Sequence, residues 1–296
     1  MSLPTAIMPS ITNYSARLEY TRQLIAEADY ILIGAGAGLS AAAGLEYTGE
    51  EFQREFRPWI ERYGITDLYS SSFYPFPSEE ERWAYWARHI WFARFRPAAT
   101  ELYLKLFRCI KEKEYFVITT NVDAQFEKAG FAKKRIFATQ GDYAYLQARS
   151  GNPKTLVYNE AWVKEALAAT HDCRIPTRLV PRHPQTGELM TPNLRCDATF
   201  VEDTYWHTQA EAFQAFVENA FERKLLLLEF GVGFNTPVII RFPFEKIALT
   251  APQTTLVRFN RDHPQLQFDA IENFVCFTEE LPLVIENLIE KSELEC

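Results

Sequence analysis

The chain has 296 residues, of which 47% are hydrophobic, enough for a large buried core in one large domain or two small ones. Its formal net charge of -8 and its isoelectric point near 5.3 argue against a general affinity for nucleic acid or anionic membranes, because the summed field repels both. No apolar run approaches the roughly 20 residues of a membrane span and the N-terminus lacks a signal-peptide layout, so we expect a cytoplasmic protein whose five scattered cysteines are reduced.

Residues 13–27 have the apolar spacing of a helix, and residues 29–33 form a brief apolar run that ends abruptly in glycine. The run is too short for a helix, so we interpret it as a buried strand. The small residues 40–43 then begin a second helix. The strand, the loop and this helix follow one another in the order that a dinucleotide-binding fold requires.

The loop between this strand and helix carries the pattern Gly36-x-Gly38-x-x-Ala41, which fits the dinucleotide fingerprint in its G-x-G-x-x-A form. Glycines let the backbone come close to a bound group, and the N–H groups at the start of a helix attract phosphate. We therefore predict a diphosphate-binding loop. The alternative is a glycine-rich turn that only packs the helix against the sheet.

Residues 49–98 form an aromatic-rich insert with helical spacing, in which Glu and Arg alternate with Trp, Tyr and Phe. We expect most of these aromatic side chains to pack in a core. The insert follows the cofactor loop, so it is also a candidate lid. Four arginines could meet an acidic partner there, although a solvated helix face is the simpler expectation: Arg54, Arg57, Arg82 and Arg88.

Polar residues follow two further predicted strands directly. The first strand, 115–119, comes after a helix at 100–112 and runs into residues 119–123; the second, 135–138, is followed by Thr139-Gln140-Gly141-Asp142. Because α/β folds bind ligands at the carboxyl ends of their strands, both junctions are predicted to face the cofactor.

Between residues 143 and 205 the alternation of strands and helices lapses. A helix-like piece at 160–169 is followed by a Pro- and Arg-rich segment with a hairpin turn at 184–187. We interpret this region as a small inserted lobe. Alternation then resumes with predicted elements at 207–223, 225–230, 254–260, 274–277 and 281–292, and a glycine turn at 231–233.

This order of elements predicts an α/β fold, a doubly wound parallel Rossmann-like sheet with a smaller inserted lobe. The predicted parts are a core at approximately 13–48, 99–142 and 206–292, a helical insert at 49–98 and a small lobe at 143–205.

Four of these junctions resemble motifs of the sirtuin family. Gly36-Ala37-Gly38-Leu39-Ser40 resembles the GAG-x-S loop, and Thr119-Thr120-Asn121-Val122-Asp123 followed by Ala129-Gly130 resembles T-Q-N-I-D and A-G. Gly231-Val232-Gly233 stands where sirtuins carry G-T-S, and Val257-Arg258-Phe259-Asn260 resembles V-x-I-N. Since the motifs occur in the same order over most of the chain, residues 1–296 resemble a single sirtuin-type catalytic unit.

The resemblance implies that NAD is consumed as a co-substrate by cleavage of its nicotinamide–ribose bond, without hydride transfer. Loss of neutral nicotinamide builds positive charge on the ribose, which polar side chains stabilise in a site shut off from water. The resemblance assigns catalysis to Asn121, Asp123 and Gln140, although Asn121 could instead be a strand-end cap. It assigns NAD binding to the same three residues and to Gly36, Ala37, Gly38, Ser40, Gly231 and Asn260.

Gln140-Gly141 stands where deacylating sirtuins carry H-G. Histidine can take a proton from the ribose hydroxyls near neutral pH, whereas an amide cannot act as a base. Deacetylation needs that proton removed, so we do not expect efficient deacetylation. Direct attack of an anionic acceptor on the ribose carbon does not need it, and Gln140 can still hold the ribose by hydrogen bonds. The alternative is a neutral replacement in an inactive enzyme.

Two further departures from the sirtuin pattern are present. Sirtuins carry two Cys-x-x-Cys pairs in a zinc ribbon, where this chain has only Cys173 and Cys196, with His171 and His183 as possible helpers. We therefore expect no zinc and no other metal site, and two ordinary cysteines of the lobe. Tyr47-Thr48-Gly49 replaces F-R-G, so we expect a differently shaped cofactor loop and acceptor channel.

The glutamine and the missing zinc ribbon are similar to the macrodomain-linked sirtuins of pathogenic microbes, called class M. That resemblance implies mono-ADP-ribosylation of a lipoylated carrier related to the glycine cleavage H protein, reversal by a macrodomain hydrolase, and a role in oxidative stress. A basic patch around Arg174, Arg178 and Arg182 would dock such an acidic carrier. Two alternatives stay open: a weak NAD-dependent deacylase or NAD hydrolase, and a module that binds NAD or ADP-ribose without turnover.

Overall fold

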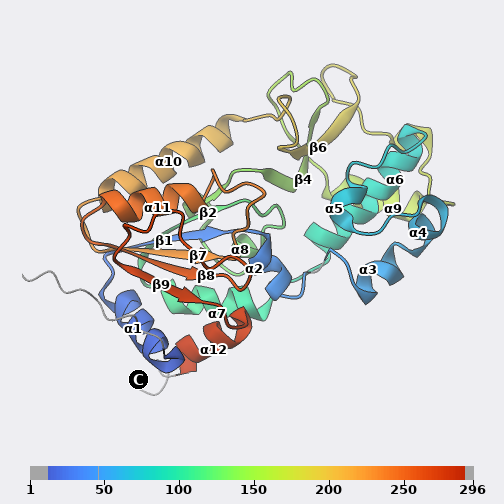
Figure 1. The fold of residues 1–296 in the computed structure, drawn as a ribbon. Helices are drawn as coiled ribbons and strands as arrows, with labels where there is room; N and C mark the ends of the chain where they lie inside the picture. The colour runs from blue at the N-terminus through green and yellow to red at the C-terminus, as the bar shows by residue number, and fades with distance from the viewer. Residues whose placement is uncertain (1–12, 46, 291–296) are drawn as a thin grey trace, which may run out of the picture.

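A computed structural model describes residues 13–45 and 47–290, and within them a six-stranded parallel sheet of order β3-β2-β1-β7-β8-β9 forms the centre (Figure 1). The strands are β1 (Tyr30–Ala35), β2 (Glu114–Thr119), β3 (Ile136–Ala138), β7 (Leu225–Phe230), β8 (Thr254–Phe259) and β9 (Phe274–Phe277). The strand order reverses between β1 and β7, as in a doubly wound sheet. This arrangement confirms the predicted α/β fold.

Helices cover both faces of the sheet (Figure 1). One face packs against α10 (Thr204–Ala220) and α11 (Arg241–Thr250), and the other lies under α1 (Tyr14–Glu27), α7 (Glu101–Ile110) and α12 (Leu281–Glu290). Strand β1 serves both layers, because its alternating side chains enter different cores: Ile31 and Ile33 on the α7 side, Leu32 on the α10 side. Residues 291–292 of the predicted closing helix lie outside the described range.

The helical insert and the small lobe share one hydrophobic core and are here called the second module, residues 49–98 and 141–203. Phe52 and Trp83 of the insert belong to the same buried cluster as Tyr143 and Val163 of the lobe. The predicted packing of the aromatic residues in a core is thus confirmed for most of them. The elements are α3 (Glu50–Glu55), α4 (Arg57–Tyr63), α5 (Leu68–Ser71), α6 (Glu79–Ile90), the π-helix η1 (Trp91–Phe95), β4 (Gly141–Ala148), β5 (Val157–Tyr158), α9 (Glu160–Ala169), η3 (Thr177–Leu179) and β6 (Met190–Leu194).

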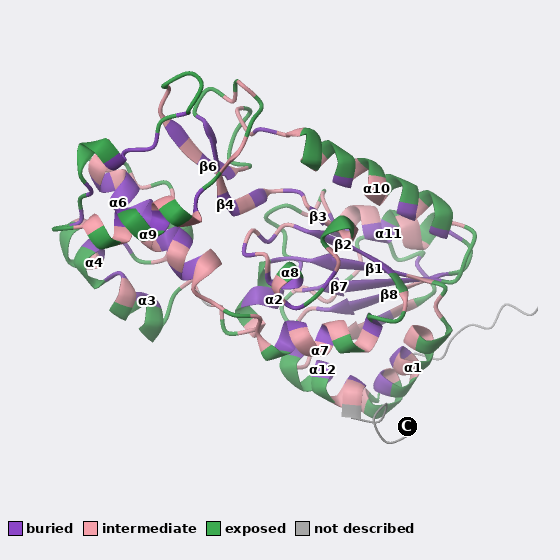
Figure 2. Ribbon diagram, turned by 180° about the vertical axis from the view of Figure 1, so that it is seen from behind, coloured by how far each residue is buried: buried purple, intermediate pink, exposed green. Residues whose placement is uncertain are grey.

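Figure 2 shows that the strands of the central sheet are buried, while the helices keep exposed outer faces. The second module lies at one end of the molecule, with β4 and β6 between its helices and the sheet (Figures 1 and 2). Short helices complete the chain: α2 (Ala37–Ala42), α8 (Gln125–Lys128) and the 3-10 turn η2 (Lys133–Arg135). None of the described helices combines the length and the apolar character that a membrane crossing requires.

Some helices differ from the expected ones. α11 was not predicted, because Pro237 and Pro243 punctuate its region; Pro243 lies in the first turn, where a missing N–H breaks no intrahelical hydrogen bond. α10 begins at Thr204, before the expected residue 207, because the side chain of Asp203 accepts a hydrogen bond from the backbone N of Trp206 and caps the helix. α2 begins at Ala37, inside the glycine loop.

Candidate active site

A cleft of about 960 Å³ lies between the sheet and the second module, at the carboxyl ends of β1, β2, β7 and β8. Parallel α/β sheets bind ligands at this edge, where the strand order reverses. The predicted site residues that line the cleft are Gly36, Ala37, Gly38, Asn121, Gln140, Gly231 and Asn260. Ser40 and Asp123, also predicted, are buried and are linked to Asn121 by hydrogen bonds.

Two glycine loops touch backbone to backbone at the floor of the cleft. Gly36 N donates to Phe230 O and Gly38 N donates to Gly231 O, both at 3.0 Å. A Cβ atom on Gly36 would lie 2.7 Å from Gly231 O, and one on Gly38 would lie 2.8 Å from Gly231 Cα. Only glycine allows this approach, so peptide groups form the surface here and a diphosphate can lie against it.

The side chain of Asn121, just beyond β2, has a fixed orientation. Its Nδ2 donates to Gly36 O at 3.0 Å and to Ser40 Oγ at 3.1 Å. A backbone carbonyl only accepts, so the nitrogen faces Gly36 and the amide oxygen Oδ1 faces away from it. Among the described residues Oδ1 accepts no hydrogen bond. Asn121 therefore joins two loops, which a simple strand-end cap would not do, and keeps one oxygen for a ligand.

The side chain of Asn121 is held by a group of hydrogen-bonded side chains, Ser40, Asp123 and Tyr103. Ser40 Oγ donates to Asp123 Oδ2 at 2.6 Å, and Gln125 N donates to Asp123 Oδ1 at 2.9 Å. Burial raises the pKa of Asp123, while these hydrogen bonds act in the opposite direction. Because the Ser40 proton is directed to Asp123, the Tyr103 hydroxyl, 2.9 Å from Ser40 Oγ, donates to Ser40. Tyr103 was not predicted, because on α7 it fits an ordinary core position.

Gln140 follows β3 and is half-buried at the cleft. Its backbone oxygen accepts from Arg195 N at 3.0 Å, whereas its side chain makes no hydrogen bond within the described residues. The next residue, Gly141, has φ +96°, and a Cβ there would lie 2.0 Å from Asn193 O. Glycine is therefore required at the turn into β4, and the Gln140 amide keeps both its donor and its acceptor for a ligand.

Two arginines near the end of β3 were not anticipated from the sequence. Arg195 lines the cleft, and its Nη2 pairs with Glu202 at 2.6 Å. Arg94, on η1, forms a two-point ion pair with Asp142: Nε to Oδ1 at 2.7 Å and Nη2 to Oδ2 at 3.2 Å. Neither arginine belongs to a recognisable local sequence motif. Arg94 and Asp142 are distant in the sequence and meet only in the folded chain.

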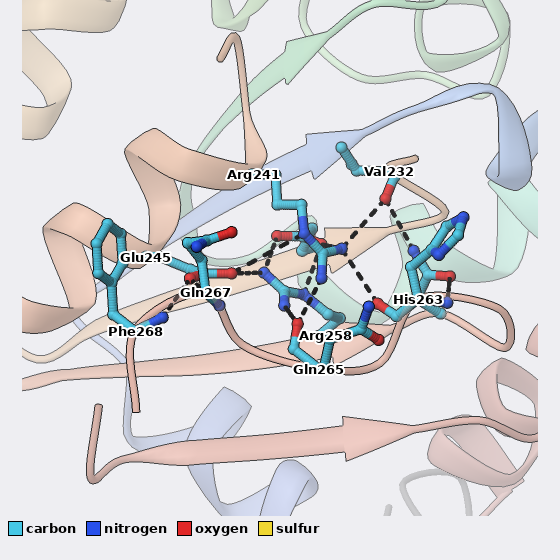
Figure 3. Close-up of polar contacts among 10 residues, drawn as sticks. Val232, Arg241, Glu245, Arg258, His263, Gln265, Gln267 and Phe268 are labelled. Carbon is cyan, nitrogen blue, oxygen red and sulfur yellow. Dashed lines mark hydrogen bonds and ion pairs between the residues drawn. The ribbon is translucent and has the colours of Figure 1, made fainter. Parts of the chain in front are cut away.

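The opposite end of the cleft is built over four fully buried charged side chains (Figure 3). Arg258 donates to Glu229 from Nε at 2.7 Å and from Nη2 at 2.9 Å, and Nη2 also reaches Glu245 at 2.7 Å. Arg241 Nη1 lies 3.6 Å from Glu229. Burial raises the pKa of Glu229, and the charge of Arg258 opposes this rise. Two positive and two negative charges thus balance each other in the protein interior.

This network holds the loops that reach the predicted adenosine end of the cleft (Figure 3). Arg241 Nη1 donates to His263 O at 3.1 Å and to Val232 O at 3.5 Å. Asn260 joins the same loops, because its Nδ2 donates to Val232 O at 2.8 Å and its Oδ1 accepts from His263 N at 2.9 Å. The side chain of Asn260 therefore orders the cleft wall.

A second cavity of about 270 Å³ lies on the other side of residues 121–123, enclosed by β3, α8 and the start of α10. Asn121 and Val122 line both this cavity and the large cleft. Carboxylates in its wall already have partners: Asp142 is paired with Arg94 and Asp203 caps α10. Residues 121 and 122 are therefore accessible from two sides.

Within residues 13–45 and 47–290, no three His, Cys, Asp or Glu side chains are grouped to hold a metal ion. Cys173 is buried in the core of the second module, whereas Cys196 is exposed and lines the cleft. His183 Nε2 lies 3.0 Å from Thr155 Oγ1. The two cysteines therefore differ in their surroundings.

No family model matches the chain. The chain is 31% identical over 268 residues to a Staphylococcus aureus (strain Mu50) protein named protein ADP-ribosyltransferase, a match that covers 90% of this chain and 85% of the relative. It is also 31% identical over 260 residues to a Fusarium oxysporum f. sp. cubense protein named probable bifunctional ADP-ribose hydrolase/ADP-ribosyltransferase. That match covers 82% of this chain but only 42% of the fungal protein.

Solved sirtuin structures share the fold of this chain. A structure described as a basis of sirtuin substrate affinity superposes with a TM-score of 0.58 at 17% identity, over 92% of this chain and 98% of the other. A Sir2 homologue in complex with NAD gives a TM-score of 0.57 at 16% identity, over 94% of both chains. At these identities the likeness establishes a sirtuin fold.

We predict that Gly36→Ala weakens NAD binding by about fivefold or more, because its Cβ would force the two glycine loops apart, a distortion worth roughly 1–3 kcal/mol. The matched control is Gly233→Ala, which also lies in the cleft but whose Cβ would meet no atom within 4 Å. Isothermal titration calorimetry with NAD measures both. Equal affinities of the two variants would contradict the proposed role of the backbone contact.

We also predict that Arg258→Met lowers the free energy of unfolding by roughly 3–5 kcal/mol, because it leaves Glu229 and Glu245 buried without their main partner. Arg261→Met is the control, since Arg261 pairs only with carboxylates on the surface, where solvent screens the interaction and little stability is lost. Urea unfolding followed by circular dichroism measures the difference. If both variants unfold at the same urea concentration, the buried network does not stabilise the fold as described.

Proposed function

Because this chain belongs to the protein ADP-ribosyltransferases with a sirtuin fold, we propose that it attaches a single ADP-ribose to an acceptor protein. As acceptor we propose a lipoylated carrier related to the glycine cleavage H protein. NAD is the co-substrate. The observation that carries the proposal is a complete Asn121 cluster beside an amide, Gln140, where deacylating sirtuins carry histidine.

Asn121 supports cleavage of the nicotinamide–ribose bond. Departure of neutral nicotinamide leaves positive charge on the ribose of the bound NAD. The Oδ1 atom of Asn121 has no protein partner among the described residues, and its amide is fixed by Gly36 and Ser40. A dipole that is already oriented stabilises this charge without reorganisation during the reaction. We assign Asp123 a supporting role, because it holds Ser40, which in turn accepts a hydrogen bond from Asn121. Both carboxylate oxygens of Asp123 accept hydrogen bonds, one from Ser40 and one from Gln125.

Gln140 separates ADP-ribosyl transfer from deacylation. Its side chain can donate to one ribose hydroxyl and accept from another, but it cannot remove a proton. His263, whose backbone N donates to Asn260 Oδ1, is the one histidine among the described residues that line the cleft, and it lies at the other end. An acceptor that arrives as an anion, such as a carboxylate, needs no base. This difference supports transfer over the alternative of a weak deacylase or NAD hydrolase.

The proposed docking patch around Arg174, Arg178 and Arg182 is partly neutralised within the chain. Arg178 pairs with Glu165 at 2.9 Å, and Arg174 lies 4.0 Å from Glu80. The docking surface therefore stays a prediction. As functional partner we propose a macrodomain hydrolase that removes the modification; the name of the fungal relative joins hydrolase and transferase activities in one protein.

Incubation with NAD labelled in its adenine, together with a purified lipoylated carrier, tests the function. We expect label on the carrier, and loss of at least about 100-fold in transfer for Asn121→Ala, because the preorganised oxygen is removed. Circular dichroism checks that this variant is folded. Free ADP-ribose or acyl-ADP-ribose as the main product would favour the deacylase or hydrolase, and unchanged NAD would favour a module that only binds it.

Two substitutions of Gln140 separate positioning from base catalysis. Gln140→Ala should slow transfer about five- to tenfold, because a hydrogen bond of roughly 1 kcal/mol to the ribose is lost. Gln140→His introduces a base and should raise the formation of acetyl-ADP-ribose from NAD and an acetylated peptide above the wild-type level. Normal transfer by Gln140→Ala would identify the side chain as a spectator.

A further inference from the structure

The short helix α8 comes directly after the turn 121–123, and its first residue, Gln125, is completely buried. Gln125 Nε2 donates to Ala98 O at 3.0 Å, and Gln125 Oε1 accepts from Thr100 N at 3.0 Å. Only this orientation of the amide places a donor at the carbonyl and an acceptor at the N–H. Gln125 therefore binds two backbone groups of residues 94–100, which run from the end of η1 in the second module to α7 and are here called the connector.

A lysine three residues further along α8 holds the connector at two more points. Lys128 Nζ donates to Pro97 O at 2.8 Å and to Arg94 O. Burial and the nearby charge of Arg94 lower the pKa of Lys128 to about 8, so at neutral pH its ammonium group still donates to both carbonyls. The connector is thus fixed to α8 at four backbone atoms.

The backbone of Gln125 leads from the connector to Asn121. Gln125 N donates to Asp123 Oδ1 at 2.9 Å. Asp123 Oδ2 in turn accepts from Ser40, and Ser40 accepts from Asn121. Between Asp123 and Gln125, Ala124 has φ +55°, a left-handed conformation that persists in a residue with a Cβ only where the surrounding contacts hold it. A continuous series of hydrogen bonds therefore runs from the connector through Gln125 to Asn121.

We propose that Gln125 is a positioning residue, which couples the connector, and with it the second module, to the side chain of Asn121. The cleft lies between the sheet and the second module, so NAD bound there lies against both. A glutamine suits this task, because its one donor and one acceptor satisfy two backbone groups that an apolar side chain would leave unpaired. The coupling to NAD does not depend on the proposed acceptor, whereas the effect on the transfer rate rests on the proposed function.

Hydrogen exchange of the Thr100 amide, followed by NMR on the full-length protein, tests the coupling. In Gln125→Met this amide should exchange about fivefold faster, because it loses its acceptor. Saturating NAD should slow the exchange about threefold in the wild type and leave it unchanged in Gln125→Met, because the variant interrupts the series of hydrogen bonds. The matched control is Gln209→Met, which should behave as the wild type, because Gln209 is a buried glutamine that binds two carbonyls outside the connector, Lys133 O and Ile136 O.

Lys128→Met is a second variant, at a half-buried position, that tests the same coupling if Gln125→Met does not fold. It releases two carbonyls of the connector and should speed exchange of the Thr100 amide about twofold or more. Equal exchange in the wild type and in both variants overturns the inference. So does an effect of NAD on Thr100 that is absent in the wild type, unchanged in Gln125→Met, or lost to the same degree in Gln209→Met.

The reaction provides the second measurement. With the lipoylated carrier and varied NAD, Gln125→Met should lower kcat for nicotinamide release about fivefold with little change in KM, because Asn121 loses part of its fixed orientation. Gln209→Met should change neither value. An unchanged kcat in folded Gln125→Met contradicts the role in positioning. A wild-type protein that releases no nicotinamide with the carrier contradicts the proposed acceptor, and the exchange result then decides on Gln125.

Discussion

The backbone contact between the loop after β1 and the loop after β7 is the constraint on which the active site depends. Gly38 N donates to Gly231 O, and no Cβ fits between them at Gly36 or Gly38. Because the residues in contact are glycines, no side chains stand between the ends of the neighbouring parallel strands β1 and β7, and peptide groups face the cleft. The contact also places Gly36 O where the amide of Asn121 reaches it at 3.0 Å, so the glycine contact helps to determine the position of the Asn121 side chain.

Hydrogen bonds and ion pairs between buried polar groups then favour one arrangement of the side chains and loops around the cleft. A buried donor or acceptor without a partner costs roughly 1–3 kcal/mol, which disfavours any alternative packing of the Asn121 cluster. Asn121 Nδ2, Ser40 Oγ and Asp123 each have partners in the cluster. At the other end of the cleft, the buried ion pairs of Arg258 and Arg241 hold the neighbouring loops in the same way. Both clusters hold the protein backbone, so the cleft is formed before a ligand arrives.

The sheet and the cofactor loops were predictable from the sequence, because β1, β2 and β7 are short apolar runs that end in glycine or polar residues. The network around them was not. Tyr103 on α7 occupies a position that any core residue could fill, and its partner Ser40 is distant in the sequence. α11 was missed because two prolines in its region are typical of a loop, although the first turn of a helix tolerates proline. Local patterns specify strands and turns, whereas contacts between distant side chains depend on the packing of the whole chain.

The protonation of the groups around Asn121 limits which acceptors the site can serve. Burial raises the pKa of Tyr103 and of Tyr47, so both phenols keep their protons at neutral pH. Asp123 is buried, accepts hydrogen bonds from Ser40 and from Gln125, and does not line the large cleft, so an incoming group in that cleft does not contact it. With an amide at position 140, the described residues around Asn121 stabilise charge but provide no free base near neutral pH. Under the proposed function, an acceptor that is already deprotonated suits this site, and a carboxylate that is ionised at neutral pH meets this condition where a lysine ammonium or a neutral serine hydroxyl does not.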